Sequence, residues 1–248
     1  MNADESSLRS PGSAGRVIVA IDGPAGAGKS TIARRLARRF GLLNLETGAM
    51  YRAFALKALR AGIALDAIAD LAKLADETHI RLEASGDENR VLLDGEDVTA
   101  LIRDQSVTDA ASRVSVFPAI RAWMVRLQQE MGAAGGVVME GRDIGTVVFP
   151  RAEVKIFLDA APEVRGMRRF DQLGPRPALQ PDDVIRDLRA RDERDRNRAD
   201  SPLKAAPDAV LLDSTDMTLE EVVKAAEEIV SARLAELAAS HETRIDRA

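Results

Sequence analysis

The sequence predicts an α/β fold in which helices wrap a five-stranded parallel sheet. Three observations predict it. Short apolar runs rich in Val, Ile and Leu recur along the 248 residues, at 17–21, 42–45, 137–139, 154–158 and 209–213. Segments with the apolar spacing of helices separate them. A glycine-rich turn follows the first run and leads directly into a helical pattern. Continuous apolar runs of this length are typical of parallel strands, which are buried on both faces.

Helical patterns fill most of the spaces between these runs. They are predicted at 32–40, 53–61, 66–78, 106–131, 162–170, 181–199 and 218–238. The fourth pattern is expected to break at Pro118, because proline does not fit the middle of a helix. Thr47 is expected to cap the second helix. Thr218, with Glu221 three residues later, predicts a capping box at the start of the last one.

A single folded unit is expected over residues 16–238. The polar stretch 1–15 predicts a disordered tail, and 239–248 a frayed end. Residues 79–104 depart from the alternation of strands and helices. Short strands around a Gly-Asp-Glu-Asn turn predict a small antiparallel unit inserted into the parent fold. The glycine and prolines between 174 and 181 predict a mobile loop.

Composition excludes several classes of partner and site. The net charge of −5 argues against a nucleic-acid partner. The absence of cysteine excludes disulfides and thiolate metal sites. No apolar run is long enough to cross a membrane, and the polar N-terminus does not have the pattern of a secretory signal. A cytoplasmic protein is therefore expected.

The glycine-rich turn carries the strongest chemical signal. It matches the pattern G-x-x-x-x-G-K-S/T between a strand and a helix, which is typical of a phosphate-binding loop. Glycines let backbone N–H groups curl around a phosphate, and the following helix points its positive end at the same anion. The alternative is a chance glycine-rich turn. The expected ATP-binding residues are Gly23, Pro24, Ala25, Gly26, Ala27, Gly28, Lys29, Ser30 and Thr31, with Lys29 reaching the β- and γ-phosphates and Ser30 ligating Mg²⁺.

Polar residues follow two other predicted strands. Thr47, Tyr51 and Arg52 come after the second strand, and Arg142 with Asp143 after the third. Ligands bind at the carboxyl ends of strands in such sheets, and guanidinium groups match phosphate oxygens. We therefore expect these side chains to meet the phosphate loop. A surface ion pair on a turn is the alternative for Arg142 and Asp143.

A dense run of charge occupies 191–200. On a helix, Arg191, Asp195 and Arg198 share one face, and Arg194 shares part of it. Such alternation is equally typical of a solvated helix with surface salt bridges. Neither histidine has neighbours in sequence that argue for catalysis.

Together these segments resemble a known family. IDGPAGAGKST, ETGAMYR, EGRDIGTVVFP, KIFLDA, RDERDRNR and LLDSTDMTLEEV, in this order, are similar to bacterial cytidylate kinases. The resemblance covers about residues 16–230. It implies a P-loop kinase fold and transfer of the ATP γ-phosphoryl group to CMP or dCMP. It also implies a CMP-binding role for the insertion at 79–104 and a lid at about 163–180.

The resemblance implies roles for single residues as well. Thr47, Tyr51, Arg52, Arg142 and Arg198 would surround the CMP phosphate. Ser112, Arg121 and Asp143 would meet the cytosine, and Arg191 and Asp195 the ribose. Lys29, Arg142, Arg194 and a lid arginine, Arg168, would be catalytic. Mg²⁺ would accompany ATP, and the enzyme would act as a monomer.

Rival functions remain open at this stage. A related kinase acting on another nucleotide, shikimate or gluconate would share the phosphate loop. A GTPase switch would need an N-K-x-D string after a late strand, and the nearest match, at 197–200, lies inside the charged helix. A bare ATP-binding module would have no acceptor at all.

Overall fold

A five-stranded parallel sheet forms the centre of the computed structural model, which describes residues 17–85, 88–174 and 180–245. Its strands lie in the order β2-β6-β1-β7-β8. They are β1 (Ile18–Asp22), β2 (Leu43–Glu46), β6 (Val137–Gly141), β7 (Val154–Asp159) and β8 (Val210–Asp213). All neighbouring strands run parallel. The predicted sheet is therefore confirmed, and the carboxyl ends of β1 and β6 lie side by side.

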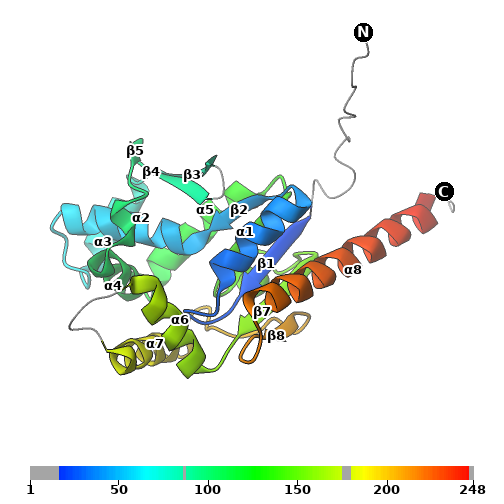
Figure 1. The fold of residues 1–248 in the computed structure, drawn as a ribbon. Helices are drawn as coiled ribbons and strands as arrows, with labels where there is room; N and C mark the ends of the chain where they lie inside the picture. The colour runs from blue at the N-terminus through cyan, green and yellow to red at the C-terminus, as the bar shows by residue number, and fades with distance from the viewer. Residues whose placement is uncertain (1–16, 86–87, 175–179, 246–248) are drawn as a thin grey trace, which may run out of the picture.

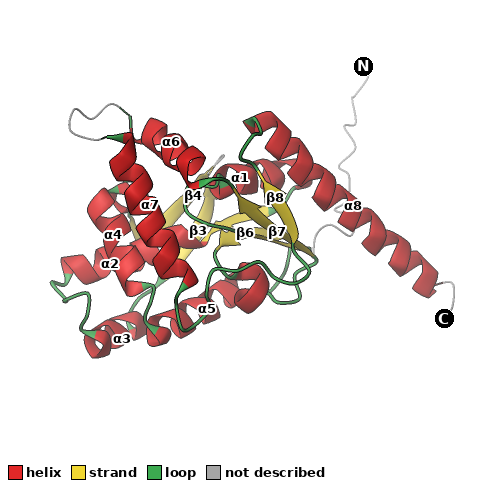
Figure 2. Ribbon diagram, turned by 90° about the horizontal axis from the view of Figure 1, so that it is seen from below, coloured by secondary structure: helices red, strands yellow, loops and turns green. Residues whose placement is uncertain are grey.

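Helices cover this sheet on both faces (Figure 1). The helices of the described residues are α1 (Lys29–Phe40), α2 (Thr47–Arg60), α3 (Ile68–Asp76), α4 (Gln105–Val114), α5 (Pro118–Gly132), α6 (Pro162–Leu173), α7 (Pro181–Arg196) and α8 (Leu219–Ile245). Alternate residues of β1 pack on opposite faces of the sheet. Val19 and Ile21 pack with α1 and α8, whereas Ala20 faces the opposite side, where α5 contributes to the cluster. Figure 2 shows the end of α8 extending away from the sheet.

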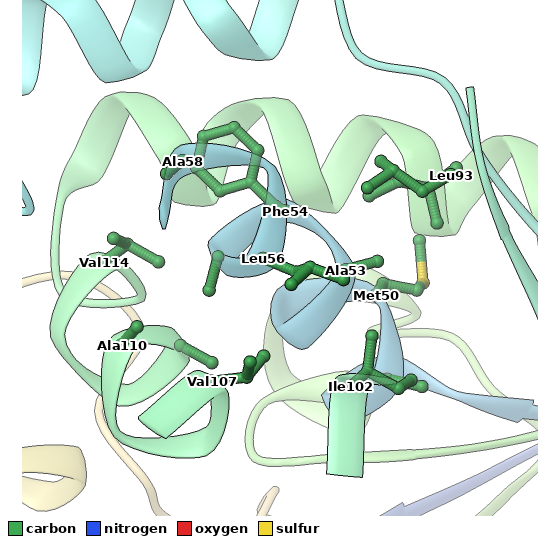
Figure 3. Close-up of a cluster of buried hydrophobic side chains, with 14 of the residues drawn as sticks. Met50, Ala53, Phe54, Leu56, Ala58, Leu93, Ile102, Val107, Ala110 and Val114 are labelled. Atoms are coloured by element: carbon green, nitrogen blue, oxygen red, sulfur yellow. The ribbon is translucent and has the colours of Figure 1, made fainter. Parts of the chain in front are cut away.

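A second apolar core lies beside the sheet and joins α2, α4 and α5 to a small antiparallel sheet. That sheet has the order β3-β4-β5, with β3 (Ile80–Ser85), β4 (Glu88–Leu93) and β5 (Glu96–Asp97). Phe54 is fully buried in this core, which also contains Met50, Val107, Val114 and Leu93 (Figure 3). The predicted antiparallel insertion is thus confirmed, and it packs directly on the helices that follow β2.

Several element boundaries differ from the prediction. The break at Pro118 is confirmed, and α5 begins at that residue. The capping box is confirmed too, since the Thr218 backbone N–H donates to Glu221 Oε2 at 2.8 Å, and the Glu221 N–H donates to Thr218 Oγ1 at 3.3 Å. The cap predicted at Thr47 is wrong, because Glu46 occupies that position and makes no side-chain cap. The last helix continues to Ile245, past its predicted end at 238.

Three predicted segments lie partly or wholly outside the described residues. They are the tail at 1–15, the centre of the predicted mobile loop at 175–179, and positions 246–248 of the predicted frayed end. Within the described ranges, no helix combines the length and the apolar character needed to span a membrane.

Candidate active site

The glycine-rich loop connects β1 to α1 at the middle of the sheet. Its shape depends on glycine. Gly23, Gly26 and Gly28 have φ values of 149°, 76° and 95°, in the region that side chains disfavour. A Cβ on Gly23 would lie 1.9 Å from the carbonyl oxygen of Leu158, on β7. Only glycine allows the loop to pass this close to the neighbouring strand.

Lys29 and Ser30 open α1 beneath this loop. Lys29 Nζ donates to the Pro24 carbonyl at 2.7 Å, so the lysine bridges the loop from within. Burial, followed by the charge of Arg142, lowers the pKa of Lys29 to about 7. Ser30 Oγ donates to Glu140 Oε1 at 2.7 Å. The loop lysine is therefore held where added negative charge would favour its protonated form.

A cluster of arginines lies beyond the end of β6. Arg142 Nε donates to Asp195 Oδ2 on α7 at 2.9 Å, and Arg198 lies 3.8 Å from the same carboxylate. Burial, followed by the charge of Arg142, lowers the pKa of Arg191 to about 10. Burial opposes ionisation of Asp195, yet its guanidinium neighbours hold the pKa of this carboxyl below its ordinary value. A single carboxylate thus faces several positive charges.

Several guanidinium nitrogens of this cluster have no hydrogen-bond partner. Among the described residues, the buried unpartnered atoms include Arg52 Nε, Arg191 Nε and both Nε and Nη2 of Arg198. Buried donors in proteins are almost always paired. Arg52 is also paired with Glu46 at 2.6 Å. Unpaired donors and excess positive charge together are typical of a site that binds an anion such as phosphate.

Arg121 and Asp143 form a buried ion pair at the edge of this cluster. Arg121, on α5, and Asp143, after β6, are 4% and 7% exposed. Arg121 Nη2 donates to Asp143 Oδ2, and its Nη1 donates to the hydroxyl of Tyr51 at 3.5 Å. Burial raises the pKa of Tyr51 to about 12. Burial excludes the alternative of a surface ion pair on a turn.

The other residues for which the resemblance implies contact with CMP or a catalytic role lie in the same region. Thr47 is buried, and its hydroxyl donates to the carbonyl of Glu140 at 2.7 Å. Arg194 Nη2 donates to Ser112 Oγ at 3.3 Å, which connects α7 to α4. On α7, Asp192 and Asp195 are buried, so the fully solvated helix that the charge pattern also allowed is excluded.

The arginines of α6 divide into different roles. Arg168, predicted as catalytic, donates from Nη1 to Ser214 Oγ at 2.9 Å and from Nη2 to the Ser214 carbonyl at 2.7 Å, so it is bound to the loop after β8. The charge of Arg169 instead contributes to the lowered pKa of Arg191. The charge of Arg169 thus acts on Arg191, whereas Arg168 is bound elsewhere, because adjacent side chains of a helix point in different directions.

Two carboxylates in the site were missed from the sequence. Glu140 precedes the motif of Arg142 and is 5% exposed beside Ser30. Asp22 accepts hydrogen bonds from the backbone N–H groups of Ile144 and Gly145, at 2.8 and 2.7 Å. These hydrogen bonds hold the short π-helix η3 (Ile144–Val148) against the end of β1. The position of each carboxylate at a strand end is the sequence signal that could have identified it.

In the ranges that the structure describes, no group of three or more His, Asp or Glu side chains is arranged to hold a metal ion by itself. The hydroxyl of Ser30 and the carboxylate of Glu140 do lie together beside the phosphate loop, 2.7 Å apart. Both are oxygen donors, the type that Mg²⁺ prefers.

Comparisons with known proteins agree with this geometry. A family model described as cytidylate kinase matches residues 19–232. A cytidylate kinase of Solibacter usitatus (strain Ellin6076) is 49% identical over 222 residues, which cover 88% of this chain and 94% of that protein. A cytidylate kinase of Pelotomaculum thermopropionicum is 50% identical over 208 residues, covering 83% and 92%.

Solved structures add little at this level of similarity. A gluconokinase from Sinorhizobium meliloti 1021 aligns over 93% of this chain and 97% of its own, with 14% identity and a TM-score of 0.47. A likeness this distant carries no argument about function. The sequence relatives do show the family, and the family model spans nearly all of the described part of the chain. This chain therefore belongs to the cytidylate kinase family.

Proposed function

We propose that this protein transfers the γ-phosphoryl group of ATP to CMP or dCMP, giving ADP and CDP or dCDP. One observation carries the proposal beyond family membership. Buried arginine nitrogens that have no partner among the described residues belong to the cluster beyond the end of β6, the strand that pairs with β1 next to the phosphate loop. A donor phosphate on the loop and an acceptor phosphate on the arginines would meet at this edge of the sheet.

The residues suit phosphoryl transfer without a general base. The attacking group would be an oxygen of the CMP phosphate, which is already anionic. Catalysis then depends on aligning two phosphates and neutralising their charge. In this scheme the nine residues from Gly23 to Thr31 hold ATP, with Lys29 on its outer phosphates. The acceptor phosphate lies among Thr47, Tyr51, Arg52, Arg142 and Arg198, and its ribose lies near Arg191 and Asp195.

Arginines close to both phosphates would stabilise the transferring group. Arg142 and Arg194 are assigned this role. On α6, Arg169 takes the place first expected for Arg168, because Arg168 is bound to Ser214 whereas Arg169 influences Arg191. Loss of one such donor typically lowers turnover about a hundredfold to a thousandfold.

Cytosine would be selected by Asp143, Arg121 and Ser112. A carboxylate can accept a hydrogen bond from the exocyclic amine of cytosine, and a guanidinium can donate to the ring acceptors. Uracil has a carbonyl in place of the amine and would face the Asp143 carboxylate unpaired. A buried group left without a partner discriminates strongly between such analogues.

Mg²⁺ fits the proposed donor site. Ser30 and Glu140 offer a hydroxyl and a carboxylate oxygen 2.7 Å apart, and both are hard ligands that suit this ion. When bound with ATP, Mg²⁺ would neutralise charge on the β- and γ-phosphates. Ser30 remains the proposed ligand, directly or through water, and Glu140 would orient it.

The remaining features extend this proposal. The segment 79–104 would serve as the CMP-binding insertion, and about 163–180 as a lid. We propose that the enzyme acts as a monomer. We place it in the cytoplasm, where its nucleotide substrates are produced. Light scattering of the purified protein would test the monomeric state.

Substrate comparison tests the function. Turnover is measured with ATP and equal concentrations of CMP, dCMP, UMP, AMP, shikimate or gluconate. CMP or dCMP should give the highest kcat/KM. Faster turnover of UMP, AMP, shikimate or gluconate would overturn the acceptor assignment. ATP binding with no acceptor turned over would favour a bare ATP-binding module.

A further inference from the structure

A buried ion pair between α6 and α7 lies against the phosphate loop. Arg165, on α6, is 2% exposed, and Asp192, on α7, is 6% exposed. Arg165 Nη1 and Asp192 Oδ2 are 2.5 Å apart. Neither residue belongs to the donor or acceptor sets proposed above. Burying such a pair is costly unless further hydrogen bonds complete it, so its other contacts indicate what it does.

Those contacts converge on one residue of the loop. Asp192 Oδ1 accepts a hydrogen bond from the Ala25 backbone N–H at 3.2 Å, and Arg165 Nη1 donates to the Ala25 carbonyl at 2.9 Å. Arg165 Nε also donates to the carbonyl of Ala160, just after β7, at 2.8 Å. One ion pair thus holds both backbone polar groups of Ala25 and fixes them to the end of a core strand.

Side-chain packing reinforces this attachment. Ala25 lies in an apolar cluster with Val184 and Leu188 of α7. A Cβ on Gly26 would lie 3.0 Å from the carbonyl oxygen of Arg165, so the loop passes close to the backbone of α6. The glycine-rich loop therefore packs against both α6 and α7, the pair of helices called the α6–α7 hairpin below.

The hydrogen bonds also determine which backbone groups remain for a ligand. With its N–H donated to Asp192, Ala25 cannot offer that group to a phosphate. The conformation of the loop around Ala25 is consequently set by the ion pair. We infer that Arg165 and Asp192 are positioning residues that hold the phosphate loop in its ATP-binding conformation. This inference rests on the proposed function only in naming ATP as the ligand.

The neighbouring turn of α7 contacts the other half of the site, so loss of Asp192 is expected to affect ATP and not CMP. Asp195, three residues after Asp192, pairs with Arg142 on the acceptor side at 2.9 Å. The two carboxylates of one helix thus contact different halves of the site. Loss of Asp192 should weaken ATP binding and leave CMP binding intact, whereas general damage to α7 would weaken both.

Asp192→Asn is the first test. ATP and CMP affinities are measured separately by titration, and KM for each is measured in the coupled assay. We expect Kd and KM for ATP to rise about tenfold or more. The amide loses the charge that pairs with Arg165, and it has an oxygen for only one of the two donors, Arg165 and the Ala25 N–H. Kd for CMP without ATP should stay within about twofold of wild type. An unchanged Kd for ATP, or equal losses for both nucleotides, would overturn the inference.

Arg189→Gln is the matched control. Glu163 and Arg189 form an ion pair between the same two helices, but both side chains are more than half exposed and neither contacts the loop in the described structure. This variant should bind both nucleotides as wild type does. A tenfold loss of ATP affinity in it would show that any weakening of the hairpin has this effect, which would contradict a specific role for Asp192.

Two further measurements guard against a variant that fails to fold. The double variant Arg165→Met, Asp192→Leu keeps an apolar contact of similar volume, a type of replacement that proteins often tolerate. Wild-type ATP affinity in this folded variant would overturn the inference. In the wild-type protein, hydrogen exchange at the Ala25 amide should be slow without ATP, and exchange at the rate of an exposed amide would contradict the bond to Asp192.

The outcomes separate this inference from the proposed function. If wild type and Arg189→Gln bind ATP but do not phosphorylate CMP, the proposed acceptor fails while the titrations still test the ion pair. If CMP is phosphorylated and Asp192→Asn binds ATP normally, the positioning role alone fails.

Discussion

At the scale of single residues, adjacent side chains serve different elements. Arg142 pairs with Asp195 on α7, and Asp143 pairs with Arg121 on α5. These two adjacent residues follow β6, so one short segment reaches both α7 and α5. The sequence predicted that these residues belong together near the phosphate loop. It could not predict their partners, which come from helices distant in the chain.

Arg142→Ala should affect the acceptor far more than the donor. The change removes a buried positive charge and leaves Asp195 without its closest partner. We expect kcat/KM for CMP to fall about a hundredfold or more. Kd for ATP, measured by titration without CMP, should change by less than about threefold. Equal losses for the two nucleotides would mean that Arg142 serves the donor site as well.

Lys29 should take up a proton when ATP binds above neutral pH. Burial and the charge of Arg142 lower its pKa to about 7, so at pH 8 much of the free protein carries a neutral lysine. Phosphate charge would raise that pKa again and draw a proton from solution. Calorimetry in buffers with different ionisation enthalpies measures this uptake. Lys29→Arg is the control, because arginine stays charged, and equal uptake by both proteins would exclude Lys29 as its source.

Asp22 should make folding stability depend on pH. Burial, opposed by its two backbone hydrogen bonds, raises the pKa of Asp22 from 3.8 to about 6. Because the folded value is higher, protonation stabilises the fold below about pH 4, and this contribution of about 3 kcal/mol is lost as the pH rises through about 6. Asp22→Asn should therefore gain stability relative to wild type between pH 4 and 7. Urea unfolding of both proteins across this range tests the prediction, and a constant difference would contradict it.

At the scale of elements, α7 shows what a charge pattern can and cannot reveal. Its spacing predicted a face shared by Arg191, Asp195 and Arg198, but a solvated helix would have the same pattern. Contact with the phosphate loop and with Arg142 decides between them, and that contact depends on packing against α6. For the same reason the sequence could not show that Arg168 binds Ser214 while the charge of the adjacent Arg169 acts on Arg191.

Gly166→Val should separate α6 from α7. A Cβ at this position would lie 2.2 Å from Ile185 Cγ1 and 3.2 Å from Ile185 Cα, so the backbones must move apart. Overpacking of this kind costs about 1–3 kcal/mol of unfolding free energy. Urea denaturation measures the loss. Met167→Val is the matched control at the next position, which is 43% exposed and should change stability by less than about 0.5 kcal/mol.

At the scale of the whole molecule, the fold class follows from the apolar runs but the strand order does not. Five runs separated by helices predicted a parallel sheet, whereas the order β2-β6-β1-β7-β8 depends on pairings between distant segments. The antiparallel insertion was visible because its strands are local neighbours. Its packing against α2 became clear only from the core around Phe54.

The two apolar cores should unfold together. The only tryptophan, Trp123, packs against Phe54 with ring centroids 5.1 Å apart, so its fluorescence reports on the core beside the sheet. Far-UV circular dichroism reports on the whole chain. Because α2 continues directly from β2 and contacts β6, both signals should give the same urea midpoint. An earlier fluorescence transition would show that the second core unfolds separately.

The pairing of β1 has a consequence for synthesis on the ribosome. Ile18 pairs with Val137 on one side and Val19 with Val154 on the other, so β1 has no sheet partner among the residues made shortly after it. β2 likewise pairs only with β6 within the described sheet. The apolar first strand therefore stays without a sheet partner until more than half of the chain has left the ribosome. The phosphate loop is among the first segments translated and among the last to acquire its final shape.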